Sequence, residues 1–488
     1  MRAGVPLWAL LIVTVLCACA RNPVSGRPEV VLVSKQAEVG LGEEAAKEVA
    51  ATIGLVPDEA LQAYVQQIGA RLAVESPRQD VEYHVAVVDI PEPNAFALPG
   101  GYVYVSRGLL ATAIREDELA AVIGHEIGHV AGRHTVQQVT TATPFAIVLG
   151  LPGAIVGTVS RSLGSILEFP GKVTGGLVLA RRGRNQEHEA DRTGMQIAAA
   201  AGWDPHALGD ILGRMERLSE LARDGESTKT TYFDSHPTTA ERVGNVDAFA
   251  AGLESADVPA IAAGRNAFLQ RLNGLLLADN PTAGVFADQT FLHPELGFQI
   301  DLPADWQRQN HSTHVLAVKP ESKGRTFAML QISSKGEDPI EGARADGLHK
   351  RLLDQLVPSE IHGLPAVVLE TEERGSLYHV TWIAHRGSVY RISAVSDTSD
   401  LASSREILQR VAPTFRDLRP QDLERIRAHR LRTTAARPGE TIATLYERSP
   451  STWTPTEAAL YNDVTTDAAL EAGNLIKLSR EEPYQLSR

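Results

Sequence analysis

The sequence contains almost no cysteine. Its two cysteines, Cys17 and Cys19, both lie within the first twenty of its 488 residues. The remainder of the chain therefore cannot form a disulfide framework, an iron–sulfur site, a cysteine-liganded zinc site or a cysteine nucleophile.

Basic and aromatic residues are also scarce. Lys and Arg number 47 against 60 Asp and Glu, which gives a formal net charge of −13, and aromatics make up 5% of the chain. A general nucleic-acid binder needs an excess of basic residues, so the charge balance argues against that class. The hydrophobic cores must depend on Leu, Val, Ile and Ala. At about 150 residues per domain, the length predicts two to four domains.

The N-terminal residues account for both cysteines. Residues 1–18 have a basic Arg2 followed by the apolar run Leu7–Leu16, which is too short to cross a bilayer and is typical of a signal peptide. The segment Leu16-Cys17-Ala18-Cys19 resembles the bacterial lipoprotein box, which would make Cys19 the lipidated first residue of the mature chain. An ordinary signal peptide cut nearby is the alternative. Because Ala20 rather than Asp follows the cysteine, the resemblance implies a lipid-anchored protein of the cell envelope, on the periplasmic face of the outer membrane.

The patterns along the chain predict an α+β protein with three modules. A tether at 19–34 precedes a mainly helical domain with a small β-sheet at 35–260, in which helical periodicity covers 35–74, 116–139, 185–201, 204–222 and 236–253. Alternating residues at 81–88 and 101–106 predict two strands. A strand-rich α+β module follows at 290–418. An arginine-containing linker helix at 420–432 then leads to a small C-terminal module at 433–488.

The sharpest chemical signal is the pentapeptide His125-Glu126-Ile127-Gly128-His129. Residues four apart on a helix face the same way, so His125 and His129 can bind one zinc ion while Glu126 lies beside the attacking water as general base.

A catalytic zinc needs a third protein ligand, and three residues compete for that role. His134 lies five residues after His129, one short of the metzincin spacing. His188 is flanked by Glu187 and Asp191, which are four apart on a second predicted helix. We expect Glu187 to bind the zinc and Asp191 to contact a ligand imidazole or the reacting substrate. An acidic helix start without metal is the alternative.

These motifs resemble the zinc metallopeptidases of the HtpX, BepA and CAAX-prenyl-protease type over about residues 35–255. The resemblance rests on His125-Glu126-x-x-His129, on Glu187-x-x-x-Asp191, on the segment 94–105 and on Ser235-His236-Pro237; Gly183 stands where serine is usual. It implies a gluzincin-type fold, one zinc ion per chain, and a proton-donating role for Asp191; an orienting role toward His125 or His129 is the alternative.

The third motif concerns His236. In the periplasmic members that the sequence resembles, this histidine closes the zinc as a fourth ligand. We expect the polar segment 223–235 to let His236 move, so that it acts as a latch. The alternative is a residue packed by Pro237 near a helix start.

The strand predicted before the metal helix is the expected substrate-binding element. Its residues Gly101, Tyr102, Val103 and Tyr104 would offer an edge to which an extended peptide pairs through main-chain hydrogen bonds. Simple strand packing of the two tyrosines is the alternative.

Two further regions carry weaker signals. The uncharged run 135–160 contains two prolines and several glycines, which favours a helical hairpin near the active site over a membrane span; a membrane-touching or substrate-gating loop remains open. The tail weakly resembles LysM modules, which implies contact with peptidoglycan sugars. Histidines of the 290–418 module are scattered without ligand spacing.

The sequence therefore predicts a zinc metalloendopeptidase of the bacterial cell envelope. Its substrates would be misfolded or unassembled envelope proteins, and it would contact the membrane through the lipid anchor. Two alternatives are a catalytically quiet chaperone or assembly factor on the same fold, and a binding protein docked on the cell wall through its tail.

Overall fold

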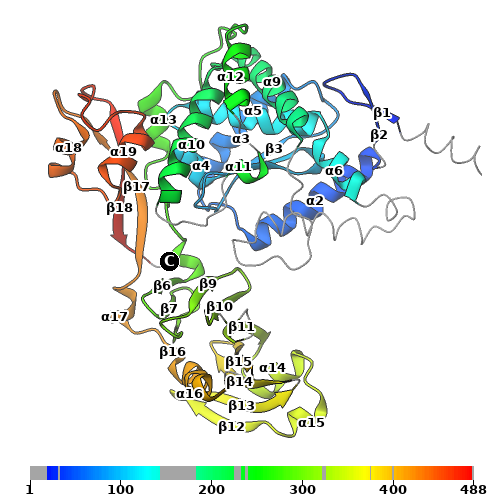
Figure 1. Cartoon of the computed structure of the whole chain (residues 1–488), viewed down its shortest axis with the longest axis vertical. Coiled ribbons are helices and arrows are strands. Elements are labelled where there is room, and N and C mark those ends of the chain that lie inside the picture. Colours follow the sequence, from blue (N-terminus) through cyan, green and yellow to red (C-terminus); the bar gives the residue numbers. More distant parts are fainter. Residues whose placement is uncertain are drawn as a thin grey trace, which may run out of the picture. The chain divides into compact units, whose positions relative to one another are not determined.

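The computed structural model describes residues 19–30, 33–142, 183–224, 232–236, 240–320, 322, 326–373, 375–397 and 401–485. The chain divides into two compact units (Figure 1). Residues 1–277 and 429–480 form the first, and residues 278–428 and 481–488 form the second. The C-terminal tail thus returns to the unit that contains the histidine motif.

The first unit is mainly helical. Its helices are α2 (Lys35–Thr52), α3 (Glu59–Val74), α4 (Arg107–Thr112), α5 (Glu116–Ala131), α6 (His134–Ala142), α9 (Arg184–Ala200), α10 (Ala207–Asp224), α11 (Tyr232–Ser235), α12 (Ala240–Ala250), α13 (Arg265–Arg271), α18 (Ile442–Arg448) and α19 (Pro455–Asn462). Its strands are β1 (Cys19–Arg21), β2 (Pro28–Val30), β3 (His84–Val88), β4 (Ala95–Ala97) and β5 (Tyr102–Ser106), and the tail pairs β17 (Arg427–Ala435) with β18 (Leu475–Pro483).

Local signals set several helix ends. The helical pattern over 35–74 is confirmed as α2 and α3, and Asp58 caps α3 by accepting the Leu61 N–H at 2.9 Å. The single helix predicted over 116–139 is instead two helices, α5 and α6. The chain breaks after Gly132 because Arg133 adopts a left-handed backbone conformation with φ of 55°. The Arg133 guanidinium then reaches the buried Glu38 at 2.7 Å.

The small sheet has the order β3-β5-β4, which corrects one expectation from the sequence. β5, which holds Tyr102, Val103 and Tyr104, is the central strand: it pairs in parallel with β3 and antiparallel with β4. Because both of its edges are occupied and Gly101 belongs to the turn before it, this strand cannot receive a substrate. Within the described residues, β4 is the strand at the sheet edge nearest the histidine motif.

The residues expected to form a tether begin with a small hairpin. β1 pairs antiparallel with β2, with Cys19 opposite Val30. Asn22 lies between the strands and is 2% exposed. Its side-chain oxygen accepts the N–H groups of Val24 and Ser25 at 2.8 and 3.1 Å, which closes a tight turn.

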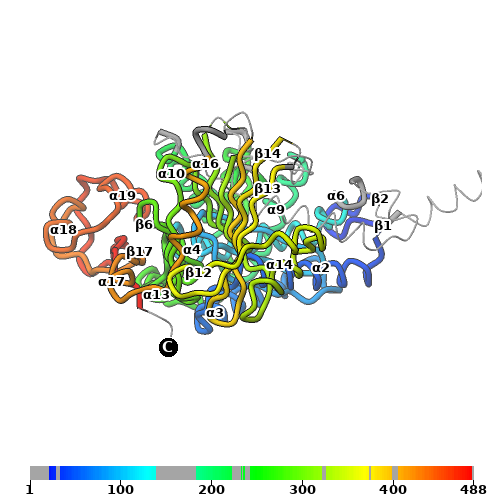
Figure 2. Tube along the Cα trace, turned by 90° about the horizontal axis from the view of Figure 1, so that it is seen from below, coloured from blue at the N-terminus to red at the C-terminus, as the bar shows by residue number. Residues whose placement is uncertain are grey.

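The second unit is built on two antiparallel sheets. The larger has the order β12-β13-β14-β15-β11-β10-β9 and the smaller β16-β8-β7-β6; Figure 2 shows β13 and β14 side by side. The strands are β6 (Val285–Ala287), β7 (Thr290–His293), β8 (Phe298–Asp301), β9 (Gln307–Asn310), β10 (His314–Val318), β11 (Phe327–Lys335), β12 (Val357–Ile361), β13 (Leu364–Glu373), β14 (Ser376–His385), β15 (Ser388–Asp397) and β16 (Arg416–Asp417). The helices are α14 (Pro339–Ala345), α15 (Lys350–Leu353), α16 (Leu401–Val411) and α17 (Pro420–Leu423).

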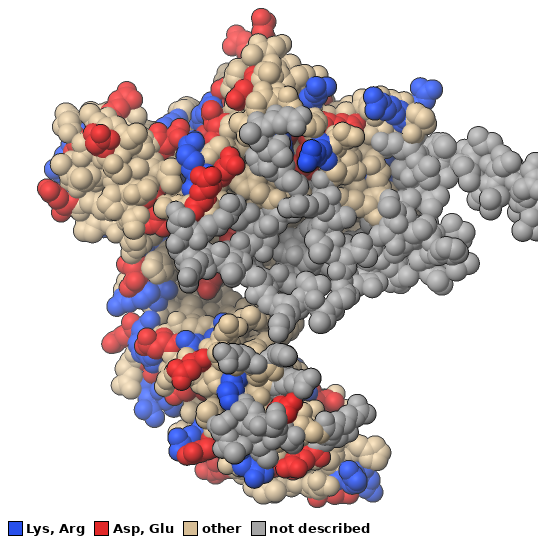
Figure 3. Space-filling model, viewed as in Figure 1, with Lys and Arg blue, Asp and Glu red and all other residues tan. Residues whose placement is uncertain are grey.

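The strand-rich character predicted for this region is confirmed, but the arginine-containing segment 420–432 is not one linker helix. It forms the short α17 and the start of strand β17. On the face drawn in Figure 3, Lys and Arg of the second unit are interspersed with Asp and Glu.

Among the described residues, no helix is both long enough and apolar enough to span a bilayer. Most of the uncharged run 135–160 and all of the predicted signal peptide lie outside those residues; only the start of the run is seen, as part of α6.

Candidate metal centre

Helix α5 carries the first part of the site. It begins with three acidic residues in its first turn, where negative charge favours helix formation. His125, Glu126 and His129 are all buried on this helix. His125 and His129, one turn apart, bring their Nε2 atoms within 3.0 Å of each other, as the spacing predicts.

Helix α9 supplies the next ligand because it packs directly against α5. A Cβ atom on Gly128 would lie 2.9 Å from the Ala190 carbonyl oxygen, and one on Gly194 would lie 2.5 Å from the backbone nitrogen of His125. Real Cβ atoms do not approach backbone so closely, so glycine at these positions lets the two helix backbones touch. This close approach lets the Glu187 side chain reach the histidines on α5.

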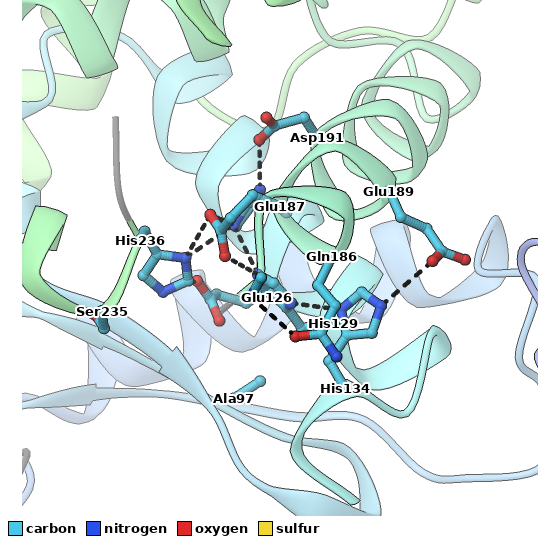
Figure 4. A network of polar contacts seen from close by, with 12 residues as sticks. Ala97, Glu126, His129, His134, Gln186, Glu187, Glu189, Asp191, Ser235 and His236 are labelled. Carbon is cyan, nitrogen blue, oxygen red and sulfur yellow. Dashed lines mark hydrogen bonds and ion pairs between the residues drawn. The ribbon is translucent and has the colours of Figure 1, made fainter. Parts of the chain in front are cut away.

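Four buried side chains converge on one point: His125, His129, Glu187 and His236. Figure 4 shows His129, Glu187 and His236 of this group. Their candidate ligand atoms all lie within 4.8 Å of one another. His125 Nε2 is 3.2 Å from His236 Nδ1, and Glu187 contacts His236 Nδ1 at 3.1 Å and His129 Nε2 at 3.3 Å. The four residues come from α5, from α9 and from the position directly after α11.

This spacing fits a tetrahedral zinc ion. Bonds of about 2.0–2.1 Å place neighbouring ligand atoms of a tetrahedron roughly 3.3 Å apart, close to the separations seen here. Three imidazoles and one carboxylate are also ligands that zinc accepts. His125 Nδ1 contacts Asp191 at 2.8 Å, so its proton lies on Nδ1 and its Nε2 lone pair faces the other ligands, where a cation satisfies it.

Charge around Glu187 keeps it ionised. Burial alone would raise its pKa, but attraction from His236 and hydrogen bonds with His129 and His236 outweigh burial and hold the pKa well below the usual value. A carboxylate rather than a neutral acid is the form that binds a metal.

Asp191 contacts the candidate ligand His125. Its Oδ1 atom meets His125 Nδ1 at 2.8 Å, and the buried Arg242 guanidinium from α12 donates to both of its oxygens at 2.8 and 2.9 Å. Burial acts to raise the pKa of Asp191, but the bonds from His125 and Arg242 lower it overall. These contacts are the ones that the orienting alternative raised by the sequence expects of Asp191.

His236 contacts both the candidate ligands and Glu126. Its Nδ1 belongs to the ligand group, and its Nε2 lies 3.4 Å from Glu126 Oε1. The buried Tyr232 ring stacks on the imidazole with centroids 4.3 Å apart and planes at 4°. The candidate fourth ligand and the expected general base are therefore in contact.

The two other histidines considered as third ligands lie outside the group. His188 is not part of it. His134 begins α6, and its Nδ1 contacts Nδ1 of His129, at 2.7 Å, on the side of that ring away from the ligand group.

Sequence reasoning missed Arg242, which also contacts Glu187 at 2.8 Å. The only sequence feature that could have indicated Arg242 is its position shortly after His236, because a buried group of acidic residues needs a positive charge nearby.

Comparisons with known proteins agree with this site. Residues 59–250 match the family model of Peptidase family M48. The mitochondrial metalloendopeptidase OMA1 of Schizosaccharomyces pombe is 30% identical over 229 residues, which cover 46% of this chain and 64% of that protein. The beta-barrel assembly-enhancing protease of Escherichia coli (strain K12) is 29% identical over 194 residues, covering 38% of each chain.

The chain thus spans less than two thirds of these relatives' length. A solved structure, cyanobacterial PsbP from Synechocystis sp. PCC 6803, aligns with 28% of this chain and 95% of its own at 12% identity and a TM-score of 0.22.

Proposed function

We propose that the chain is a zinc-dependent metalloendopeptidase of the bacterial cell envelope, whose catalytic part is the segment 59–250 that matches the model of Peptidase family M48. The observation that carries the proposal is the buried group of His125, His129, Glu187 and His236 with the carboxylate of Glu126 beside it. The two relatives, a metalloendopeptidase and a protease by name, have the same class of activity.

Each residue then has a defined task. Zinc, when bound, supplies a Lewis acid that polarises the scissile carbonyl and acidifies the attacking water. His125, His129 and Glu187 hold it. Glu126 accepts the proton of the water and passes it to the leaving amine. Asp191 fixes the tautomer and direction of His125.

We place the substrate on the edge of β4 instead of on β5. Asn94 and Leu98 direct their main-chain groups toward β5, through hydrogen bonds of 2.8 Å to Ser106 and Tyr102. Alternate residues of a strand bond in opposite directions, so Ala95 and Ala97 direct theirs away from β5. The outward carbonyl of Ala97 accepts the Thr135 hydroxyl at 3.3 Å, a contact that a paired peptide would replace. An extended peptide paired there would be read mainly through its backbone.

His236 acts as a latch in this proposal. A catalytic zinc keeps one position open for water, whereas His236 as a fourth ligand fills that position and also contacts the general base. The resting enzyme would be closed, and substrate or partner binding would favour the open state. Closure protects other proteins of the same compartment from cleavage.

The envelope location follows from the predicted lipoprotein box at Cys19. We propose that acyl chains on Cys19 anchor the protein on the periplasmic face of the outer membrane, where misfolded or unassembled envelope proteins are its substrates. The LysM-like tail would add contact with peptidoglycan.

One set of proteins tests the activity. Wild type, Glu126→Gln and His236→Ala are purified, their zinc content is measured, and cleavage of casein is followed with and without a zinc chelator. Glu126→Gln should keep its zinc and lose activity by about 10²-fold or more, because an amide cannot accept the proton. His236→Ala should cleave faster than wild type and hold zinc less tightly.

Other results would overturn parts of the proposal. Wild-type turnover by Glu126→Gln would remove the assigned base. Wild-type turnover and zinc affinity in His236→Ala would remove the latch. Absence of cleavage by both wild type and His236→Ala, with zinc bound, would favour the chaperone alternative, for which the closed four-ligand group is the supporting observation.

A further inference from the structure

His134 is a buried residue that the proposed chemistry does not use. It is fully buried at the start of α6, and its ring meets His129 edge to face. The Nδ1 atoms of the two rings are 2.7 Å apart. On its other side, His134 Nε2 lies 3.5 Å from Glu189 Oε2, a contact drawn in Figure 4.

The proton positions in this chain of contacts are fixed by the ligand role of His129. A neutral imidazole that binds a metal through Nε2 carries its proton on Nδ1. His129 Nδ1 then donates to His134 Nδ1, which must be the acceptor. His134 consequently carries its own proton on Nε2, directed at the Glu189 carboxylate. The order of donors and acceptors runs from His129 through His134 to Glu189.

Glu189 is held in turn by the N-terminal hairpin. It lies on α9, two residues beyond the ligand Glu187, and its side chain is 21% exposed. Its side chain interacts with His134 and with the side chains of Asn22 and Ser25. Ser25, His134 and Glu189 line the same pocket of about 810 Å³. The turn closed by Asn22 thus borders the acidic end of the chain of contacts.

We propose that His134 and Glu189 are positioning residues for the metal ligand His129, and that the turn at Asn22–Ser25 completes this outer shell by holding Glu189. The N-terminal hairpin, expected from the sequence to be a tether, would then set how tightly the protein holds zinc. The inference rests on the zinc site of the proposed function but not on proteolysis, so zinc binding measured directly tests it separately from activity.

Zinc affinity, measured by competition with a chromophoric chelator, is the primary readout. Loss of an outer-shell partner typically weakens metal binding by about 10- to 100-fold. We expect that loss for His134→Phe, which keeps a ring but cannot accept the His129 proton, and for Glu189→Leu. His134→Gln and Glu189→Gln should recover most of the affinity, because an amide can still accept and donate. Asn22→Ala should give a smaller loss in the same direction.

The matched control is His188→Ala. His188 is a neighbour of Glu189 on α9 and lines the same pocket, but it is outside the chain of contacts, so its removal should leave zinc affinity within about twofold of wild type. A second readout is specific to positioning: imidazole NMR of the zinc-loaded wild type should show a slowly exchanging Nδ1–H of His129. That signal should be lost in His134→Phe and retained in His134→Gln.

The proposal is overturned if His134→Phe and Glu189→Leu, shown to be folded by circular dichroism, bind zinc as tightly as wild type. If His134→Phe does not fold, the zinc affinities of Glu189→Leu and Glu189→Gln are compared instead. Equal affinities in these two variants would refute the proposal. Wild-type affinity in Asn22→Ala refutes the part assigned to the hairpin. Normal zinc binding by a wild-type protein that cleaves no substrate would count against the proposed activity and leave these comparisons intact.

Discussion

Arg242 should be the most sensitive buried charge in the first unit. The guanidinium is 2% exposed, donates twice to Asp191 and contacts Glu187 at 2.8 Å. Arg242→Met keeps much of the volume but leaves two buried carboxylates without their cation. Removing one partner of a buried ion pair costs about 3–5 kcal/mol, a large part of the 5–15 kcal/mol that stabilises a typical domain. We therefore expect the metal-free first unit to lose about 3–5 kcal/mol of unfolding free energy.

Urea denaturation of the full-length protein measures this loss. With a slope of about 3 kcal/mol per molar urea, the midpoint of the first unit should fall by about 1–1.7 M. Zinc at a hundredfold excess over its dissociation constant stabilises a protein by about 2.7 kcal/mol. At the same excess over each dissociation constant, wild type and variant gain equally, so the difference between them is measured without metal.

The matched control is Arg217→Met. Arg217 is half-exposed and meets the exposed Asp463 at 3.1 Å, a surface pair worth about 0–1 kcal/mol. A loss below about 1 kcal/mol in Arg242→Met, no larger than that of the control, would show that the carboxylates near the metal do not depend on this cation, and the electrostatic account of the site would be wrong.

Three further results are expected elsewhere in the chain. Lys477, fully buried in β18, donates to the carbonyls of Ala111, Thr112 and Ala113 at 2.7, 3.3 and 2.8 Å; Lys477→Met should cost the first unit about 2–4 kcal/mol in urea unfolding, and Lys47→Met, at an exposed lysine, almost nothing. Burial lowers the pKa of His293 to about 4, below its unfolded value of about 6.5. The second unit should therefore keep its full stability above pH 6.5 and lose on the order of 2–3 kcal/mol of unfolding free energy as the pH falls toward 4. If His293→Gln loses as much stability in acid as wild type, this prediction is wrong. Cys19→Ser should move the protein from the membrane to the soluble fraction, and retention after a carbonate wash would contradict the lipid anchor.

The parts of the site that the sequence predicts are those set by local geometry. His125 and His129 are one helical turn apart, so any helix over 116–131 brings their rings together. Glu187 and Asp191 have the same spacing on α9, and their assignments as ligand and neighbour of a ligand agree with the contacts in the structure. His236 could be placed near the metal only by resemblance, because nothing in the segment around it fixes where the chain folds back.

The parts that the sequence does not predict depend on contacts between distant segments. Alternation at 101–106 predicts a strand, but a single strand's pattern does not say which neighbours pair with it, and β5 proved to be central. Likewise, the arginines of 420–432 are compatible with an exposed helix or an exposed strand. Arg242 becomes a positioning residue only when α12 packs where its guanidinium reaches Asp191.

The glycines of the metal helices belong to the motif as much as the ligands do. Gly128 is usually read as one of the two free positions between Glu126 and His129, yet a Cβ there would lie 2.9 Å from the Ala190 carbonyl and force α5 away from α9. Zinc–ligand distances tolerate shifts of only about 0.2 Å, so even a small separation of the helices would take Glu187 out of reach. The site therefore depends on the lack of a Cβ atom at positions 128 and 194. A larger residue at either position would separate α5 from α9, and the four ligands could not meet.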